Sequence, residues 1–200
     1  LGTQAMYAYE ATAGVQFLLE LLASGDIDLL YDTRKEITLA SRKLDGAGLL
    51  GLLKKADRSF ECIRKRGFRA ANAGQFMVDL IVPPRSMRDA APITFSAGDL
   101  VASEVPVLQW LINAPKLSGC AIDEDGWPAT FRVPDPRAFA LHKAWLASQR
   151  GREPVKKPRD LAQAKAVASM VVEYMPQLSF DEALTSLHGD VRSMRSVLGV

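Results

Sequence analysis

Hydrophobic residues follow two different patterns along the 200-residue chain, and the pattern changes near residue 135. Residues 4–23 are almost wholly apolar or small, which predicts a buried helix that is broken at Gly14. Residues 26–31 and 75–82 are short apolar runs bounded by turn residues, as expected for strands. The turn sequence Asn72-Ala73-Gly74 joins the second run to residues 67–71 in a predicted hairpin.

The hydrophobic pattern of the remaining segments predicts further helices and strands of an α/β part, followed by a part that contains helices alone. We expect a helix over residues 47–60 capped by Asp45, a short helix near 105–113, and a second hairpin from 117–122 and 129–133. After Pro136, apolar residues recur at three- and four-residue steps, which predicts helices alone. The predicted fold is therefore α/β (α+β): a small mixed sheet flanked by helices over residues 1–134, then an all-helical C-terminal subdomain over 135–200.

Composition narrows the class of protein. With 48% hydrophobic and 24% charged residues, the chain has the composition of a globular protein and not of a disordered one. No apolar run approaches the roughly 18 residues of a membrane span, and no secretory leader is recognisable, so we expect a cytoplasmic protein without a membrane partner. Cys62 and Cys120 are too few and too far apart for a disulfide framework or a zinc site.

The net charge of +2 conceals alternating blocks of charge. The first 32 residues contain five acidic residues and no basic one, whereas residues 54–88 contain nine basic and three acidic residues. Residues 89–135 are acidic again, and residues 142–165 contain seven basic and two acidic residues. Such blocks suit the joint binding of a divalent cation and a polyanion, although solvated helix faces of alternating sign would give the same pattern.

Asp26 and Asp28 form the first candidate site. Residues two apart on a strand project from the same face, about 6.5–7 Å apart between Cα atoms. Two carboxylates so placed repel each other unless a cation lies between them, and Mg²⁺ or Mn²⁺ prefers such oxygen ligands. The alternative is an ordinary acidic pair at a solvated strand end.

Asp79 is the second candidate because it interrupts the apolar run over residues 76–82. A buried carboxylate without a partner costs several kcal/mol, so such a residue is normally ion-paired or metal-bound. One interpretation is an ion pair with an arginine, from residues 64–69 or from the helices. The other is that its strand lies beside residues 26–31 and supplies a third carboxylate to one metal site.

Three short motifs make the sequence recognisable: Leu1-Gly2-Thr3, the Asp-x-Asp within residues 25–30, and Val78-Asp79-Leu80. Their order resembles the nucleotidyltransferase superfamily pattern. More closely, the chain resembles a bacterial nucleotidyltransferase-fold family of unassigned substrate over residues 2–10, 28–32, 133–143 and 157–160. The later part is also similar to the abortive-infection toxin nucleotidyltransferases, in which a helical Lys and a later Arg/Lys-Asp lie near the nucleotide.

This resemblance implies a nucleotidyltransferase-type sheet and transfer of a nucleotidyl group from a nucleoside triphosphate (NTP). Asp26, Asp28 and Asp79 would be the catalytic residues and the ligands of Mg²⁺ or Mn²⁺, with Asp79 helping to deprotonate the attacking hydroxyl. Gly2 and Thr3 would offer backbone N–H groups to the phosphates. The interval from Thr3 to Asp26 is longer than usual in the superfamily, and the strand expected before Gly2 is missing, so we expect the chain to be part of a longer protein.

Basic residues of the second half are candidate NTP contacts. Lys143 and Arg150 are seven residues apart, which is two turns along one side of a helix. Together with Arg159 they would stabilise charge on a leaving pyrophosphate. A solvated basic face over apolar surface is the alternative for each of them. Asp160 suits the first turn of a helix, and its role is left open.

Two further motifs point less clearly to function. Residues 64–69 contain four basic residues that could contact an RNA or DNA acceptor, but aromatic neighbours are few, and we interpret this run as a solvated edge. Residues 46–51 match G-x-G-x-x-G, but a poor strand precedes them and no acidic residue follows at the required distance, which argues against dinucleotide binding. His142 and His188 are interpreted as structural.

The leading hypothesis is therefore metal-dependent nucleotidyl transfer to an acceptor that the sequence leaves open (RNA, protein or a small molecule). The alternative is a non-catalytic nucleotide-binding or toxin/antitoxin-type interaction module with the same fold, which predicts an Asp79 paired with an arginine. A metal-dependent nuclease using the same acids is a third hypothesis. The NTP base and the oligomeric state are not specified by the sequence.

Overall fold

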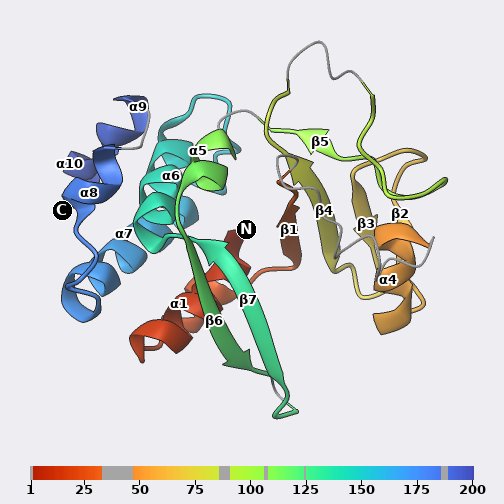
Figure 1. Cartoon of the computed structure of the whole chain (residues 1–200), viewed down its shortest axis with the longest axis horizontal. Helices are drawn as coiled ribbons and strands as arrows, with labels where there is room; N and C mark the ends of the chain where they lie inside the picture. Colours follow the sequence, from red (N-terminus) through yellow and green to blue (C-terminus); the bar gives the residue numbers. More distant parts are fainter. Residues whose placement is uncertain (1, 33–46, 86–90, 106–107, 124, 186–188) are drawn as a thin grey trace. The chain divides into compact units, whose positions relative to one another are not determined.

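The computed structural model describes residues 2–32, 47–85, 91–105, 108–123, 125–185 and 189–200. The chain divides into two compact units (Figure 1): unit 1 comprises Ser24–Gln109, and unit 2 comprises Gly2–Ala23 together with Trp110–Val200. The described residues form a five-stranded mixed sheet, a separate two-stranded hairpin and a helical C-terminal region, which confirms the predicted fold class. The division at residue 134 stays a prediction.

Unit 1 is built on the five-stranded sheet, in which neighbouring strands follow the order β1-β4-β3-β2 and β5 pairs with β4. The strands are β1 (Asp26–Leu30), β2 (Glu61–Cys62), β3 (Arg69–Ala71), β4 (Met77–Val82) and β5 (Ser103–Glu104). β1 and β4 run parallel, and β3 and β4 are antiparallel. The hairpin expected at Asn72-Ala73-Gly74 is confirmed, and so is the neighbouring placement of the two acid-bearing strands.

The two faces of this sheet differ because side chains alternate along a strand. One face contributes to a hydrophobic core that contains Ile27, Leu29, Val78, Leu80, Leu49 and Phe60. The opposite face carries Asp26 and Asp28 of β1 and Asp79 of β4. A one-residue slip of register would turn these acids toward the hydrophobic core and the apolar residues away from it, so the hydrophobic face fixes the position of the acidic one.

The helix α4 (Gly48–Ala56) packs on the hydrophobic side and is capped from a distant part of the chain. The backbone N–H groups of Leu49 and Leu50 donate to the Asp99 carboxylate at 2.7 and 2.8 Å. The helix is shorter than expected, because Asp57 already has an extended backbone. Asp45, the cap expected from the sequence, lies outside the described residues.

Unit 2 contains most of the helices and the β6–β7 hairpin, and α5 (Leu108–Asn113) precedes the hairpin. Its N-terminal elements are η1 (Gly2–Gln4), α1 (Ala5–Ala13) and α2 (Leu19–Leu22). The hairpin consists of β6 (Lys116–Ile122) and β7 (Pro128–Pro134). The C-terminal helices are α6 (Pro136–Ser148), α7 (Lys157–Tyr174), α8 (Phe180–Thr185), α9 (Gly189–Arg192) and α10 (Met194–Leu198).

The core of unit 2 lies where α1, the hairpin, α6 and α7 meet (Figure 1). Tyr9 of α1 packs edge-on against Phe139 at 5.4 Å between ring centroids, and its hydroxyl donates to the Pro134 carbonyl at 2.9 Å. Gly14 ends α1 in the left-handed region with φ of 69°, which confirms the predicted break. The helix expected over residues 4–23 is therefore several shorter pieces that bury Met6 and Tyr9.

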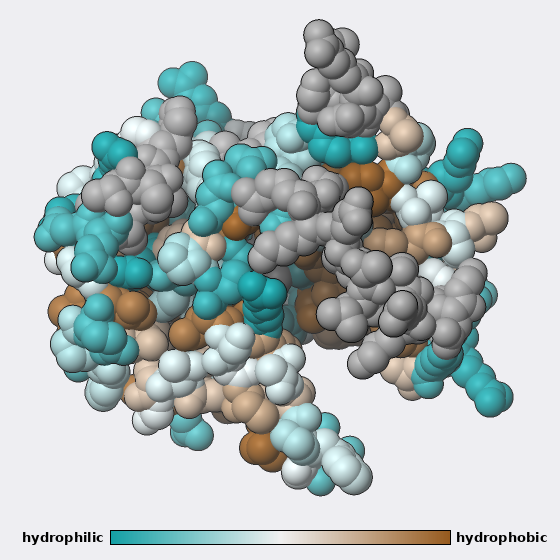
Figure 2. All heavy atoms as spheres, viewed as in Figure 1, coloured by the Kyte–Doolittle hydropathy of each residue, from teal (hydrophilic) through white to brown (hydrophobic). Residues whose placement is uncertain are grey.

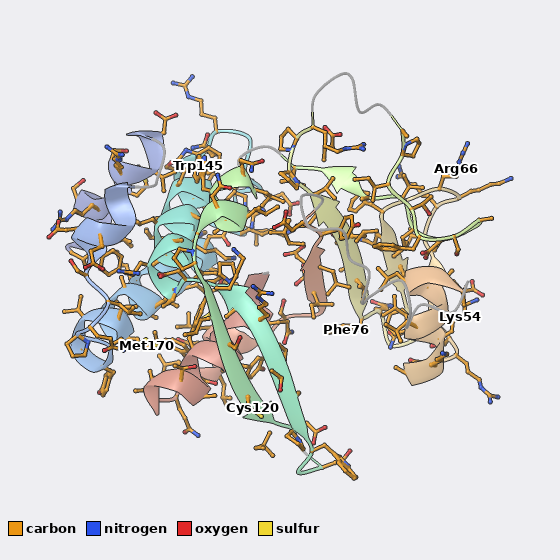
Figure 3. All side chains as sticks on the ribbon, in the orientation of Figure 1. Lys54, Arg66, Phe76, Cys120, Trp145 and Met170 are labelled. Atoms are coloured by element: carbon orange, nitrogen blue, oxygen red, sulfur yellow. The ribbon has the colours of Figure 1, made fainter. Side chains whose placement is uncertain are left out.

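The basic run at residues 64–66 lies on the surface of unit 1. Arg66 and, on α4, Lys54 point outward in Figure 3, and Figure 2 shows hydrophilic side chains projecting from the same regions. Residues 64–66 are thus exposed, whereas Arg69 of the same run is partly buried, and the interpretation of the run as a solvated edge stays a prediction. Over the described part of the chain, no helix has the length and apolar character that crossing a membrane requires.

Candidate functional site

The acidic face of the unit 1 sheet brings the three predicted carboxylates onto adjacent strands. Asp28 and Asp79 are direct register partners across the parallel β1–β4 pair, and Asp26 lies two residues before Asp28. The Ser24 hydroxyl donates to Oδ1 of Asp26. The three acids share one face of this sheet, so their charges repel one another unless positive charge lies nearby.

A positive charge already lies within this patch. Arg69 is the register partner of Asp79 on the antiparallel strand β3. Its Nε and Nη2 atoms donate to Oδ1 and Oδ2 of Asp79, both at 2.5 Å. These hydrogen bonds raise the pKa of Arg69 above its ordinary value despite partial burial, and the charges of Asp79, Asp26 and Asp28 add to the rise. The four side chains therefore form one electrostatic cluster.

The chemistry of this cluster fits a divalent cation, because its acids offer only hard oxygen ligands. Asp79 does not act as a third carboxylate ligand in this structure, since both of its oxygens accept hydrogen bonds from Arg69. In the described parts of the chain, no three His, Cys, Asp or Glu side chains are gathered closely enough to hold a metal ion. Binding of a metal ion by Asp26 and Asp28 therefore stays a prediction, and Arg69 neutralises the third acid.

Thr3 and Arg159, two predicted NTP contacts, meet within unit 2. The Thr3 hydroxyl oxygen accepts from Nη2 of Arg159 at 3.2 Å and from Nε2 of Gln163 at 3.0 Å. A hydroxyl has two lone pairs and one proton, so both acceptor positions are used and the proton remains for donation to another oxygen. Gly2, with φ of 72°, begins the short η1 helix beside them.

Arg159 and Gln163 also hold the N-terminal segment in place. Arg159 donates to the Ala23 carbonyl, and Gln163 donates to the Leu21 carbonyl at 2.7 Å. The Nε atom of Arg159 and the Oε1 atom of Gln163 are buried without a hydrogen-bond partner in the described residues. The Thr3 end of unit 2 therefore combines a positive charge, a hydroxyl with a proton to donate, and unsatisfied polar atoms.

Lys143 lies in a buried ion-pair cluster. Its ammonium donates to Oδ1 of Asp160 at 2.7 Å, and Arg152 donates to Oδ2 at 2.7 Å. Burial alone raises the pKa of Asp160, but the charges and hydrogen bonds of Lys143 and Arg152 outweigh this effect and lower it overall. Asp160, whose role the sequence left open, is therefore the shared counter-ion of two basic residues.

Arg150 does not share a helix with Lys143, because α6 ends at Ser148. It lies exposed in the turn that follows. The expected two-turn spacing along one helix face is therefore wrong, since the extended backbone of Gln149 terminates the helix. Binding of NTP by Lys143 and Arg150 stays a prediction.

His142 lies between two tryptophans and close to the ion-pair cluster. Its ring stacks on Trp145 at 6.1 Å and meets Trp110 edge-on at 5.9 Å between centroids. Burial, with a smaller contribution from the nearby charge of Lys143 and against the opposing effect of Asp160, lowers the pKa of His142 from its ordinary value to about 3. His142 is therefore neutral at physiological pH and structural, as expected; His188 lies outside the described residues.

His142 is expected to make the protein less stable as the pH falls below about 6.5. The unfolded state binds a proton near pH 6.5 whereas the folded state does so near 3, so acid favours unfolding between these values. From pH 7.5 to 5 this linkage lowers the free energy of unfolding by about 2 kcal/mol. Urea unfolding at both pH values should show this loss in the wild type and not in His142→Phe; equal losses in both would contradict it.

Three contributors were not singled out from the sequence. Gln163 had a signal, since it lies four residues after Arg159 and therefore on the same side of α7. Arg69 was included only as one of several possible partners of Asp79, although the register of the Asn72-Ala73-Gly74 hairpin favours it over the others. Arg152 had no comparable signal, because it lies in an irregular turn between two helices.

Comparison with known proteins gives the class of this chain. A family model described as nucleotidyltransferase matches residues 1–188. Because the match covers most of the sequence, the chain belongs to this nucleotidyltransferase family, and the resemblance drawn from the three motifs is confirmed at that level. No curated protein and no solved structure gives a significant match.

Proposed function

We propose that the protein transfers a nucleotidyl group from an NTP to a hydroxyl-bearing acceptor, with a divalent cation held by Asp26 and Asp28. The observation that carries this proposal is the register of the acid-bearing strands, which puts Asp28 opposite Asp79 on the same sheet face as Asp26. Family membership supports the reaction class. RNA, protein and small molecules are the acceptor classes to screen.

Each residue has a separate task in this proposal. A cation bound by Asp26 and Asp28, Mg²⁺ or Mn²⁺, would neutralise the phosphates and polarise the phosphorus–oxygen bond that breaks. Asp79, if released from Arg69, would take the proton of the attacking hydroxyl as the new bond to the α-phosphorus forms and pyrophosphate leaves. Within unit 2, Thr3 and Arg159 stay predicted NTP contacts, with the Thr3 proton available to an oxygen of the ligand and Arg159 supplying positive charge. Lys143 acts by holding Asp160 and the end of α6 in place.

A binding module without turnover is the second candidate, and one observation favours it. Asp79 is engaged by Arg69 through both carboxylate oxygens, so it is not free to accept a proton in this arrangement. Such a protein would bind an NTP and a cation without releasing pyrophosphate. Measurement of pyrophosphate release in the presence of candidate acceptors therefore separates the two functions.

The double variant Asp26→Asn, Asp28→Asn is expected to weaken binding of NTP in the presence of Mg²⁺ or Mn²⁺ by about tenfold or more, because the amides carry no charge to hold the cation. Equilibrium dialysis with each of the four NTPs, with and without the cation, measures this change. The matched control is Asp125→Asn, Glu153→Gln, which removes two exposed negative charges elsewhere. Equal affinity of the wild type and the Asp26, Asp28 variant would overturn the proposed function.

A further inference from the structure

Gln163 of α7 is a polar residue that has no exposure to solvent. Its amide nitrogen Nε2 donates to the Thr3 hydroxyl oxygen at 3.0 Å and to the Leu21 carbonyl at 2.7 Å. Because Nε2 carries two hydrogen atoms, both of its donors are used. The amide oxygen Oε1 is buried without a partner in the part of the chain that the structure describes.

The Leu21 carbonyl fixes which way the Gln163 amide faces. A carbonyl oxygen only accepts hydrogen bonds, so the amide atom that lies 2.7 Å from it must be the nitrogen. Turning the amide over would place two oxygen atoms against each other, and neither of them could donate. The same nitrogen contacts Thr3, so its position beside the Thr3 hydroxyl is fixed as well.

A fixed nitrogen beside Thr3 determines what the Thr3 hydroxyl can do. Its Oγ1 atom accepts from Nε2 of Gln163 and, at 3.2 Å, from Nη2 of Arg159, and neither nitrogen can accept a proton. The hydroxyl proton must therefore point away from both of them. An oxygen atom that has no proton of its own, such as an anionic phosphate oxygen, is the partner that suits this donor.

We propose that Gln163 is a positioning residue that makes the Thr3 hydroxyl a donor to an anionic oxygen of the NTP. This inference rests on the proposed function, because it takes Thr3 as an NTP contact. Gln163 has no exposed surface with which to touch the NTP, so it acts only through Thr3. Arg159 differs in this respect, since it is only partly buried and has a charge of its own with which to bind a phosphate directly.

Positioning of Thr3 and simple support of the fold have different consequences. If Gln163 acts through Thr3, its replacement weakens NTP binding only while the Thr3 hydroxyl is present. If Gln163 only anchors the Leu21 carbonyl, its replacement lowers the thermal unfolding midpoint but does not change NTP binding through Thr3. A double-mutant cycle between positions 163 and 3 separates these roles.

The test is the cycle formed by Gln163→Met, Thr3→Val and the double variant. Equilibrium dialysis with Mg²⁺ measures the dissociation constant for the NTP that the wild type binds most tightly of the four. We expect Thr3→Val to weaken binding roughly tenfold, Gln163→Met to weaken it roughly threefold to tenfold, and the double variant to bind no more weakly than Thr3→Val alone. The matched control is Gln177→Met, the same change at an exposed glutamine, which should bind as the wild type does.

Gln163→Glu makes the outcome decisive even if Gln163→Met does not fold. It keeps the side-chain length but replaces the fixed donor by an acceptor, which takes the Thr3 proton. It should weaken NTP binding by about tenfold or more, and most of this loss should disappear in the Thr3→Val background. Unchanged NTP affinity in both Gln163 variants, or equal losses with and without the Thr3 hydroxyl, would overturn this inference while the wild type still binds the NTP. Failure of the wild type to bind any of the four NTPs would overturn the proposed function itself.

Discussion

Replacing Asp160 by asparagine is expected to lower the free energy of unfolding by about 3–5 kcal/mol, because the change removes the buried carboxylate charge that Lys143 and Arg152 both contact. Asp160 is 3% exposed and binds Lys143 and Arg152 through separate oxygens, each at 2.7 Å. Lys143 is itself 8% exposed. Asparagine fits the same volume, so the loss reflects the uncompensated positive charge and not a cavity.

Urea denaturation of the wild type and Asp160→Asn at pH 7.5 measures this loss. The control is Glu153→Gln, which breaks the exposed pair with Lys156 at 3.2 Å and should change stability by less than about 1 kcal/mol. Adding Lys143→Met to Asp160→Asn should recover part of the stability, since the charge left without a partner is then removed. A change below about 1 kcal/mol in Asp160→Asn would show that the cluster is hydrated and not buried.

The sequence predicted well those features that short segments determine by themselves. The turn Asn72-Ala73-Gly74 sets the hairpin that pairs β3 with β4, and Gly14 ends α1 where its backbone becomes left-handed. The apolar run around Asp79 indicated a central strand, and β4 indeed has neighbours on both sides. In each case the local chemistry of a few residues leaves little choice of structure.

The partners of charged residues were predicted poorly, because they depend on contacts between distant segments. The sequence shows that Lys143 is basic and helical, but not that Asp160, 17 residues later, neutralises it. It shows an Asp79 that needs a partner and favoured a metal site, whereas the structure pairs Asp79 with Arg69. The helix over 47–60 had an expected local cap in Asp45, whereas Asp99 caps α4 from 50 residues away.

Gly48 belongs to the G-x-G-x-x-G match at residues 46–51, and its surroundings give a structural reason for a glycine that does not involve dinucleotide binding. It stands at the start of α4 with φ of 66°, a conformation that side chains disfavour. A Cβ atom at this position would meet Oδ2 of Asp99 at 2.1 Å and the Ser96 hydroxyl oxygen at 2.6 Å. The glycine therefore makes room for the carboxylate that caps the helix, so the anion-binding end of α4 is already filled by the protein itself.

Gly48→Ala is accordingly expected to lower the free energy of unfolding by about 2–4 kcal/mol, from backbone strain, overpacking and loss of the Asp99 cap together. Gly98→Ala is the matched control, because Gly98 also has a positive φ, 84°, but no atom within 4 Å of an added Cβ. It should cost only about 1–2 kcal/mol of strain, so the difference between the two variants isolates the contact with Asp99. Urea denaturation of both variants measures that difference. Equal losses would mean that Asp99 moves aside freely and that the helix end can accept another anion.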